Sequence, residues 1–325
     1  MSVENNLEKI VEKGKKQIKS FPHIIEYLHN RKITDEIIEY FDIGYSQLYG
    51  ALWIVIPIRG VEGNVMFLKL RKDPFSKDEK QPKFRFYPQG SEANIYGYDT
   101  LIEENESLCI CEGELDRMLL IFRGIPTITS TSGAGTFKDE WIKAFYGVKE
   151  ITLIFDRDEA GARGRDKLAQ KIYDEFISIK VYKVTLPEIV GDHGDITDFF
   201  IKTDGDLDKL FSTKELIERR EVPTKEELET NVNYEFDGKQ ITDKDIEIAS
   251  KADCSKFVKV IKSDSNNRKW ALCPFHKEKT PSFCCHDGGA GYYCYGCSCG
   301  GDAIDLVEKI HGLDFISAVK YILNN

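Results

Sequence analysis

Four side chains near the C-terminus have the types and the spacing of a zinc site. Cys273 and His276 form a Cys-x2-His pair, and Cys294 and Cys297 form a Cys-x2-Cys pair after seventeen intervening residues. Structural zinc sites use four such ligands in a tetrahedral set, and the metal supplies folding energy to a unit too small to build much core. The spacing therefore predicts a structural Zn²⁺ held by these four residues.

Other cysteines lie close to these ligands. Seven of the nine cysteines fall between residues 254 and 299, and in a reducing compartment such a cluster favours metal binding over disulfides. Cys284 and Cys285 fall where a strand is expected between the two pairs, so core packing is the better interpretation for at least one of them. Cys299 follows the second pair closely, and we interpret it as a bystander.

Acidic residues in the middle of the chain follow two apolar runs of strand length. Glu112 comes directly after residues 108–111, and Asp156 comes directly after residues 151–155. In an open parallel sheet, ligands bind outside the carboxyl ends of the strands. If the two strands are neighbours, Glu112, Asp156 and Asp158 converge in one crevice. Each acid taken alone is more often a helix N-cap or a solvated loop residue.

A converging set of acids implies a bound cation, because packed carboxylates repel one another and shift their protonation. Two divalent ions about 3.5–4 Å apart stabilise the attacking and leaving oxygens in nucleotidyl transfer. Mg²⁺ takes oxygen ligands, usually one or two carboxylates together with phosphates and water. We therefore predict Mg²⁺ or Mn²⁺ at Glu112, Asp156 and Asp158.

The segments that would position these acids alternate between strand and helix patterns. The strand patterns are residues 108–111, 125–129, 151–155 and 178–185, and the helical patterns between them are residues 114–123, 137–146 and 160–176. This alternation predicts a mostly parallel sheet with helices on both faces. Upstream, residues 52–58 and 64–70 read as strands, and Thr34 is a plausible N-cap of a helix.

Four regions are expected along the chain. They are a mixed α+β subdomain at residues 1–104, an α/β core at 105–215, a charged linker at 216–245 and a cysteine-rich unit at 246–325. The linker carries one candidate helical turn, Thr224–Leu228. The last unit closes with a helical stretch, Ala303–Leu323.

Composition bounds the class of protein. With 41% hydrophobic and 31% charged residues, the chain of 325 residues reads as a soluble globular protein. No apolar run reaches the length of a membrane span, and the lysine-rich N-terminus lacks the apolar core of a signal peptide. We expect a cytoplasmic protein with no membrane partner. The net charge of −10 predicts weak, salt-sensitive DNA binding through local basic residues in the stretch 67–88.

The acidic pattern resembles the Toprim domain, which is shared by DnaG-type primases, type I and II topoisomerases and some nucleases. The resemblance covers residues 107–211, where 111-CEGELD-116, the Asp-x-Asp-x-Ala-Gly at 156–161 and 194-GDITDFF-200 match the three acidic motifs. Asp198 lies one residue later than the corresponding acid of primases. The resemblance implies a Rossmann-like sheet and these catalytic acids: Glu112, Asp116, Asp156, Asp158, Asp195 and Asp198.

The upstream segment is similar to primases in particular. The similar stretches are 27-YLHNRKITDEIIEYFDIGY-45, 54-IVIPIRGVEGNVMFLKLR-71, 82-PKF-84 and 95-IYGYD-99. A lysine that primases often place before the Tyr-Gly element is missing from 90-GSEANIYG-97. The basic residues of this region are expected to bind nucleotide or template phosphates, although a solvated surface charge is the alternative for each: Arg59, Lys69, Arg71, Lys83 and Arg85.

The cysteine-rich unit resembles the CHC2-type zinc-binding domain of DnaG-type primases. The motifs 273-CPFHKEKTPSF-283 and 292-YYCYGCSCGGDAIDLV-307 carry the resemblance, which covers residues 253–325. It implies a zinc ribbon that holds single-stranded template. Lys277, Lys279, Tyr292, Tyr293 and Tyr295 would suit phosphate contacts and base stacking. The alternative is that the tyrosines pack the ribbon sheet, and it is accepted for at least one of them.

The combined resemblance predicts a DNA primase that makes short RNA primers on single-stranded DNA from NTPs by two-metal nucleotidyl transfer. The zinc module follows the core, whereas it precedes the core in the bacterial family, and this permutation suits a phage, plasmid or other mobile element. No Walker A motif occurs, so a separate replicative helicase is the expected partner. Two alternatives stay open: another Toprim enzyme, either a nuclease or a topoisomerase, and a non-catalytic single-stranded DNA-binding accessory protein of replication.

Overall fold

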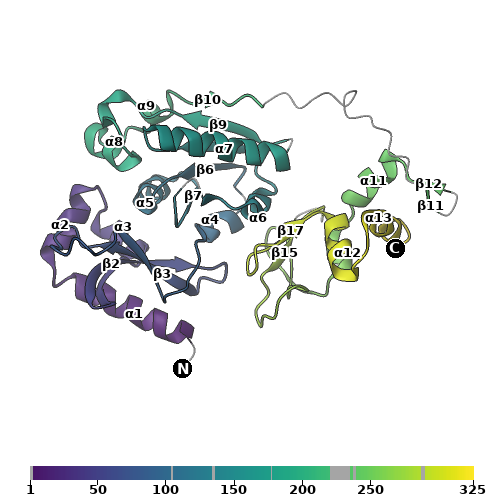
Figure 1. Cartoon of the computed structure of the whole chain (residues 1–325), viewed down its shortest axis with the longest axis horizontal. Coiled ribbons are helices and arrows are strands. Elements are labelled where there is room, and N and C mark those ends of the chain that lie inside the picture. Colours follow the sequence, from purple (N-terminus) through teal and green to yellow (C-terminus); the bar gives the residue numbers. More distant parts are fainter. Residues whose placement is uncertain are drawn as a thin grey trace. The chain divides into compact units, whose positions relative to one another are not determined.

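The computed structural model of the chain describes residues 3–103, 105–133, 136–176, 178–219, 235–236, 239–286 and 290–325. These residues form two compact units, which Figure 1 shows coloured along the sequence. Unit 1 comprises Met1–Phe137 and Val148–Ile217, and unit 2 comprises Lys138–Gly147 and Glu218–Asn325. None of the helices in the described part of the chain has the length and apolar character needed to span a bilayer.

Unit 1 begins with three helices and an antiparallel sheet. The helices are α1 (Val3–Ile18), α2 (Pro22–Asn30) and α3 (Asp35–Tyr40). The strands, in their spatial order, are β1 (Gly44–Leu48), β2 (Ala51–Arg59), β3 (Val65–Lys72) and β4 (Phe84–Tyr87). The predicted N-cap is confirmed, because the Thr34 hydroxyl accepts a hydrogen bond from the Ile37 N–H at 3.4 Å.

Both faces of this sheet are covered, as its apolar strands require. Leu7 and Val11 of α1 pack with Trp53 and Leu68 on one face. Ile56 joins the larger core cluster on the other face. The helix α1 runs along the sheet in Figure 1.

The second sheet of unit 1 is mostly parallel, as the alternating pattern predicts. Its spatial order is β10 (Glu215–Leu216), β9 (Lys180–Val184), β8 (Glu150–Ile154), β6 (Ser107–Cys111), β7 (Thr127–Ser130) and β5 (Ile95–Tyr96). The four central strands are parallel, and β5 and β10 add antiparallel edges. The connecting helices are α4 (Tyr98–Ile102), α5 (Glu114–Phe122), α6 (Asp139–Ile142), α7 (Glu159–Glu175), α8 (Ile196–Thr203) and α9 (Leu207–Phe211), with 3-10 turns at Lys143–Phe145 and Glu188–Val190.

Helices position the carboxyl ends of these strands by packing on both faces of the sheet. Cys111 and Ile154 share a buried cluster with Met118 of α5. Their neighbours Ile110 and Leu153 point to the opposite face and are also buried, and α7 contacts β8 and β9. The predicted mostly parallel core, preceded in the chain by a mixed α+β subdomain, is therefore confirmed.

Unit 2 contains an antiparallel sheet with helices around it. In spatial order the strands are β13 (Val260–Ser263), β14 (Lys269–Ala271), β15 (Phe283–Cys285), β16 (Tyr292–Cys294) and β17 (Gly300–Gly301). The helices are α11 (Asp243–Ser250), α12 (Ala303–His311) and α13 (Phe315–Leu323), with a 3-10 turn at Cys254–Phe257. The expected helical stretch at 303–323 is two helices, because Gly312 adopts φ +63° and ends α12.

Two regions differ in detail from the sequence expectations. The predicted linker at 216–245 contains the end of β10, the short strands β11 (Glu235–Phe236) and β12 (Lys239–Gln240), and the start of α11. Its candidate helical turn, Thr224–Leu228, lies outside the described residues. The helical pattern at 137–146 forms α6 and a 3-10 turn that group with unit 2. The boundaries of the four predicted regions stay predictions.

Candidate active site and zinc centre

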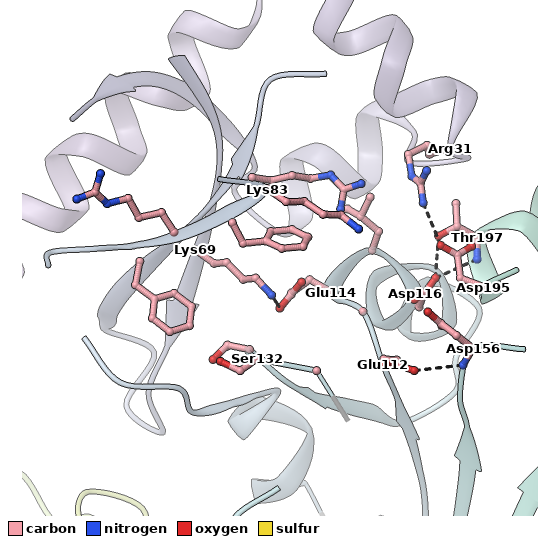
Figure 2. Close-up of a pocket in the computed structure, with 18 residues that line it drawn as sticks. Arg31, Lys69, Lys83, Glu112, Glu114, Asp116, Ser132, Asp156, Asp195 and Thr197 are labelled. Carbon is pink, nitrogen blue, oxygen red and sulfur yellow. Dashed lines mark hydrogen bonds and ion pairs between the residues drawn. The ribbon is translucent and has the colours of Figure 1, made fainter. Parts of the chain in front are cut away.

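A cavity of about 660 Å³ in unit 1 brings together most of the acidic and basic residues singled out in the sequence. One wall comes from β3 and β4, and the other from the carboxyl ends of β6 and β8 and the starts of α5 and α8 (Figure 2). The lining residues are Arg31, Lys69, Arg71, Lys83, Phe84, Arg85, Phe86, Glu112, Gly113, Glu114, Leu115, Asp116, Thr131, Ser132, Gly133, Asp156, Asp195 and Thr197.

Glu112 and Asp156 meet because their strands are neighbours. The parallel strands β6 and β8 pair Cys111 with Ile154, so the residues that follow emerge at the same edge of the sheet. The Asp156 N–H donates a hydrogen bond to Glu112 Oε2 at 3.3 Å. The geometric condition for a shared crevice is therefore met.

Asp116 is fixed within the first turn of α5. Its Oδ1 accepts hydrogen bonds from the backbone N–H of Thr197 at 2.9 Å and from the Thr197 hydroxyl at 2.7 Å. A Cβ atom at Gly113 would lie 2.6 Å from Asp116 Oδ2. The glycine after Glu112 is thus required by the close approach of this carboxylate.

The glycine of the second acidic motif has a similar cause. A Cβ atom at Gly161 would lie 2.4 Å from the carbonyl oxygen of Asp156. Only glycine lets the first turn of α7 pack this tightly against the strand end that carries the acid.

The cavity wall formed by β6, β8, α5 and α8, here called the acidic wall, carries buried carboxyl groups whose pKa values are raised. Burial raises the pKa of Asp156 to about 8, with a further contribution from Glu112. Burial also raises the pKa of Asp116 to about 7, assisted by Asp195, and raises that of Glu112. A divalent cation favours the ionised form of all these carboxyls, and oxygen donors are the ligands that Mg²⁺ and Mn²⁺ prefer. The donor set therefore fits a hard divalent metal.

The structure places two of the six predicted acids at helix caps, away from the cavity lining. Asp158 accepts a hydrogen bond from the Gly161 N–H at 2.6 Å and lies 3.1 Å from His193 Nδ1. Asp198 completes a capping box at the start of α8, where its Oδ2 accepts from the Asp195 N–H at 3.2 Å. These contacts fit the alternative interpretation of the two acids as helix-capping residues. A metal role for either residue stays a prediction.

Asp195 caps α8 and also lines the cavity. Its Oδ2 accepts a hydrogen bond from Arg31 Nη2 at 3.1 Å, and its Oδ1 accepts from the Asp198 N–H at 2.7 Å. Arg31 was not singled out in the sequence, although it lies in the primase-like stretch 27–45. The two partners are 164 positions apart in the sequence, which leaves no local signal for this ion pair.

The basic wall is one face of the β3–β4 hairpin. Lys69 and Arg71 alternate along β3, opposite Phe86 and Phe84 of β4. Three cationic side chains lie near the Phe84 ring. The ring centroid lies 4.5 Å from Lys69 Nζ, 5.4 Å from the Arg71 guanidinium carbon and 5.4 Å from Lys83 Nζ. Such cation–π contacts preorganise positive charge at the cavity surface.

Lys69 also forms an ion pair with Glu114, the residue before Leu115 at the start of α5 (Figure 2). Lys69 is 5% exposed and Glu114 is 4% exposed, so the pair is desolvated. Glu114 was missed in the sequence because its partner lies on the other sheet. Of the other basic residues, Arg71 donates to the Tyr27 hydroxyl at 3.0 Å, and the Arg85 guanidinium lies 3.8 Å from the Tyr49 ring centroid.

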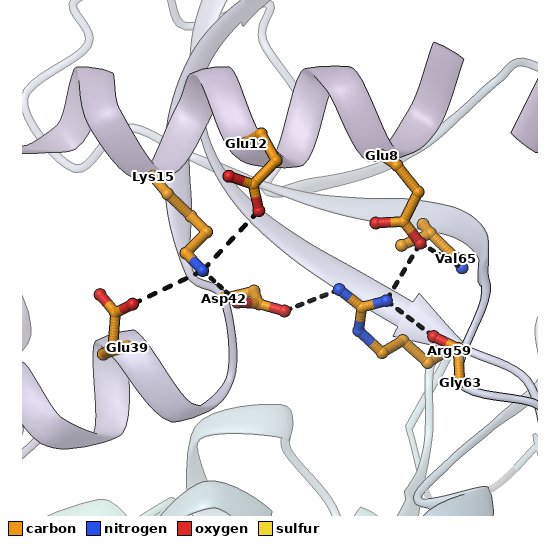
Figure 3. Close-up of polar contacts among 8 residues, drawn as sticks. All are labelled: Glu8, Glu12, Lys15, Glu39, Asp42, Arg59, Gly63 and Val65. Atoms are coloured by element: carbon orange, nitrogen blue, oxygen red, sulfur yellow. Dashed lines mark hydrogen bonds and ion pairs between the residues drawn. The ribbon is translucent and has the colours of Figure 1, made fainter. Parts of the chain in front are cut away.

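Arg59 does not line this cavity, in contrast to the expectation that it faces phosphates there. Its guanidinium contacts Glu8 at 3.1 Å, Asp42 at 2.6 Å and the Gly63 carbonyl at 2.7 Å (Figure 3). Asp42 in turn accepts from Lys15 at 2.6 Å. These contacts give Arg59 a structural role in tying α1 to the sheet.

Unit 2 assembles the predicted zinc ligands. The ligand atoms of Cys273, His276, Cys294 and Cys297 all lie within 4.8 Å of one another. Cys273 Sγ and Cys297 Sγ are 3.7 Å apart, and Cys294 Sγ lies 3.9 Å from His276 Nδ1. Ligand atoms about 2.0–2.3 Å from a tetrahedral zinc lie roughly 3.4–3.8 Å from each other. The donor set and its spacing fit zinc.

Glu278 supports this cluster and was missed in the sequence. Its carboxylate accepts hydrogen bonds from the Cys273 N–H at 2.6 Å and from the Ser282 N–H at 3.2 Å, and it lies 3.0 Å from His276 Nε2. A histidine ligand is commonly oriented by a carboxylate on its second ring nitrogen. Glu278 therefore leaves Nδ1 of His276 to face the thiols.

The three tyrosines, Cys284 and Cys285 are core residues of this unit. Tyr292, Tyr293 and Tyr295 are buried, so none of the three offers an exposed ring for base stacking, and the packing alternative holds for all of them. Burial raises the pKa of Cys284 and of Cys285 to about 12. These two thiols stay protonated in the β15 core.

Comparisons with known proteins identify both modules. The family model described as CHC2 zinc finger matches residues 242–325, and the one described as Toprim-like matches residues 109–199. The DNA primase of Thermotoga maritima is 39% identical over 66 residues, which are 20% of this chain and 11% of the relative. Across similar curated primases the matched segments span between 8% and 14% of the relative's length.

Solved structures match the fold. A DNA primase domain from Pseudomonas aeruginosa superposes with a TM-score of 0.54 at 19% identity, over 66% of this chain and 80% of that domain. The Aquifex aeolicus primase, comprising zinc-binding and RNA polymerase domains, gives a TM-score of 0.53 at 20% identity over 65% of this chain and 60% of that structure. The chain thus combines a Toprim-like core with a CHC2 zinc finger. Its resemblance to DnaG-type primases, predicted from the sequence, is confirmed in both modules and in the fold.

Proposed function

We propose that the chain is a DNA primase that synthesises short RNA primers on single-stranded DNA. The observation that carries the proposal is the two-walled cavity, in which Glu112, Asp116 and Asp156 face Lys69 and the other cations of the β3–β4 hairpin. A nucleotidyl transferase needs this combination, since metal-binding acids must stand opposite groups that hold triphosphate and nucleic-acid phosphates.

The acids of the cavity would hold the catalytic metal, for which we propose Mg²⁺ or Mn²⁺. Glu112 and Asp156 lie nearest to one another across neighbouring strand ends, and Asp116 is held rigidly by Thr197. When bound, the metal would neutralise the charge that develops on the attacking 3′-oxygen and on the departing pyrophosphate.

The basic wall would bind the NTP and the template. Lys83 and Arg71 converge over the Phe84 ring and would contact phosphate oxygens. Arg31 holds the Asp195 carboxylate, which keeps this fourth acid oriented toward the cavity. The negative net charge of the chain makes these local cations the main source of affinity, so we expect template binding to weaken steeply with salt.

The zinc module would hold single-stranded template, and a separate replicative helicase would be the partner that supplies it. Support comes from the resemblance of residues 242–325 to the CHC2 zinc finger. Lysines of the module, among them Lys277 and Lys279, are exposed or half-exposed and suited to phosphate contacts. An origin in a phage or another mobile element also belongs to this proposal, because the zinc finger follows the Toprim-like segment in this chain.

The proposal is tested by incubating the full chain with single-stranded DNA, labelled NTPs and Mg²⁺ or Mn²⁺, and sizing the products. The wild type is expected to yield short oligoribonucleotides. Glu112→Gln should reduce their yield by at least about a hundredfold, because it removes a metal-binding charge while keeping the side-chain size. Glu106→Gln is the matched control, since the Glu106 side chain is exposed, lies outside the cavity lining and pairs with Lys149.

Three outcomes would contradict the proposal. Shortening of the template without new oligonucleotides would indicate a Toprim nuclease. Relaxation of supercoiled DNA would indicate a topoisomerase. Retention of single-stranded DNA without any product under either metal would indicate a non-catalytic binding protein.

A further inference from the structure

The zinc cluster has a fifth thiol beside it. Cys299 Sγ lies 3.2 Å from Cys297 Sγ. Seven of the nine cysteines are buried, whereas Cys297 is exposed and Cys299 is half-buried. Cys299 therefore lies beside the ligand thiol of Cys297, next to the group formed by Cys273, His276, Cys294 and Cys297.

One tight turn carries both thiols. The Cys294 N–H donates to the Cys299 carbonyl at 2.7 Å, and the Ser298 N–H donates to the Cys294 carbonyl at 2.8 Å. Ser298, between the two cysteines, adopts φ +58°. This left-handed residue turns the chain so that the side chains before and after it point to the same side of the turn.

The distances between sulfur atoms distinguish thiols on different corners of a zinc site from thiols that share one corner. Two thiolates on different corners of a tetrahedral zinc lie roughly 3.7–3.8 Å apart, and the Cys273–Cys297 distance of 3.7 Å fits this value. The Cys297–Cys299 distance of 3.2 Å is too short for two corners of one tetrahedron. These two sulfurs lie where they compete for a single corner.

We propose that Cys299 is an alternate zinc ligand that exchanges with Cys297 at one corner of the site. Cys273, His276 and Cys294 hold the metal in both arrangements, and either thiol of the turn completes the set. The exchange gives the site a reserve donor at its most exposed corner, so the metal stays bound when Cys297 is chemically blocked. This property concerns the zinc module alone and does not depend on primer synthesis.

Zinc content of the full chain after gel filtration tests the exchange. The variants are Cys297→Ser, Cys299→Ser, the double variant, and Cys294→Ser as the comparison, because Cys294 is a ligand in both proposed arrangements. We expect about one zinc per chain in both single variants of the turn and nearly none in the double variant or in Cys294→Ser. With Co²⁺ in place of zinc, the thiolate-to-metal absorption should be equal in the wild type and in the two single variants of the turn.

A second measurement uses the unaltered chain and is independent of folding defects in variants. Brief alkylation of the zinc-loaded protein, followed by peptide mapping, should give about one label per chain, divided between Cys297 and Cys299, with zinc retained. Labelling of Cys299 alone would overturn the proposal. So would loss of zinc from Cys297→Ser to the extent seen in Cys294→Ser, loss of zinc from Cys299→Ser alone, or retention of zinc by the double variant.

Discussion

Replacing Asp156 by Asn should stabilise the metal-free protein, although it removes a predicted catalytic group. The pKa of Asp156 is raised from 3.8 to about 8, first by burial and then by Glu112. The folded state therefore retains this proton at pH values where the unfolded chain has lost it. Stability from this group is fully present below about pH 4 and falls as the pH rises toward about 8.

The size of the effect follows from the two pKa values. At pH 7 the difference corresponds to about 4 kcal/mol, and discounting for the solvent that reaches the half-buried side chain leaves about 2 kcal/mol. Asparagine carries no such cost and has nearly the same shape. Chemical unfolding of unit 1 in magnesium-free buffer at pH 7 should therefore give Asp156→Asn a free energy of unfolding about 2 kcal/mol above the wild type, and the gain should vanish near pH 4.

Added Mg²⁺ or Mn²⁺ should reverse the order. A metal at a hundred times its dissociation constant stabilises the wild type by about 2.7 kcal/mol, whereas Asp156→Asn lacks a ligand and gains much less. Asp208→Asn, an exposed change on α9, is the control for removing one negative charge. A variant no more stable than the wild type without metal, and equally stabilised by metal, would refute the reasoning.

Three further predictions follow from the contacts. Lys69→Met or Glu114→Gln alone should lower the free energy of unfolding by roughly 3–5 kcal/mol, since each leaves a buried charge without its partner. Combining Lys69→Met with Glu114→Leu should recover most of that loss. Equal stability of the single variants and the wild type would show that the pair is solvated. Arg59→Ala should lower the free energy of unfolding by about 1 kcal/mol and leave primer yield within about twofold of the wild type. Arg71→Ala should instead raise the apparent KM for NTP. A raised KM for Arg59→Ala and an unchanged KM for Arg71→Ala would assign phosphate binding to Arg59. Glu278→Gln should weaken zinc affinity roughly tenfold to a hundredfold in a chelator competition, and an unchanged affinity would show that the carboxylate does not orient His276.

The sequence predicted the parts of the fold that local patterns encode. Alternation of strands and helices was enough for the parallel order of β6, β7, β8 and β9, because buried parallel strands are continuously apolar. The same logic placed Glu112 and Asp156 at one sheet edge, since residues that follow neighbouring parallel strands emerge together. The zinc ligands were found because their short spacing within each pair is itself part of the geometry.

Ion pairs between residues far apart in the chain could not be predicted from the sequence. Arg31 with Asp195, and Lys69 with Glu114, join segments that have no periodic relation to one another. A charged side chain looks the same in sequence whether it faces a cavity or a neighbouring helix, and this explains why Arg59 was grouped with the residues of the basic wall. The role of Asp158 is ambiguous in the sequence for a related reason. An acid at a helix N-terminus can cap the helix or bind a metal, and the sequence pattern is the same in both cases.

Carboxylates from separate parts of the chain are proposed to hold a divalent metal beside the basic wall. Anomalous diffraction from crystals of the full chain soaked in Mn²⁺ tests this proposal most directly. We predict a peak at the strand ends, within ligand distance of Glu112 and Asp156 and near Asp116. Well-ordered carboxylates in that cavity without a peak between them, or Mn²⁺ bound only elsewhere on the surface, would contradict the account.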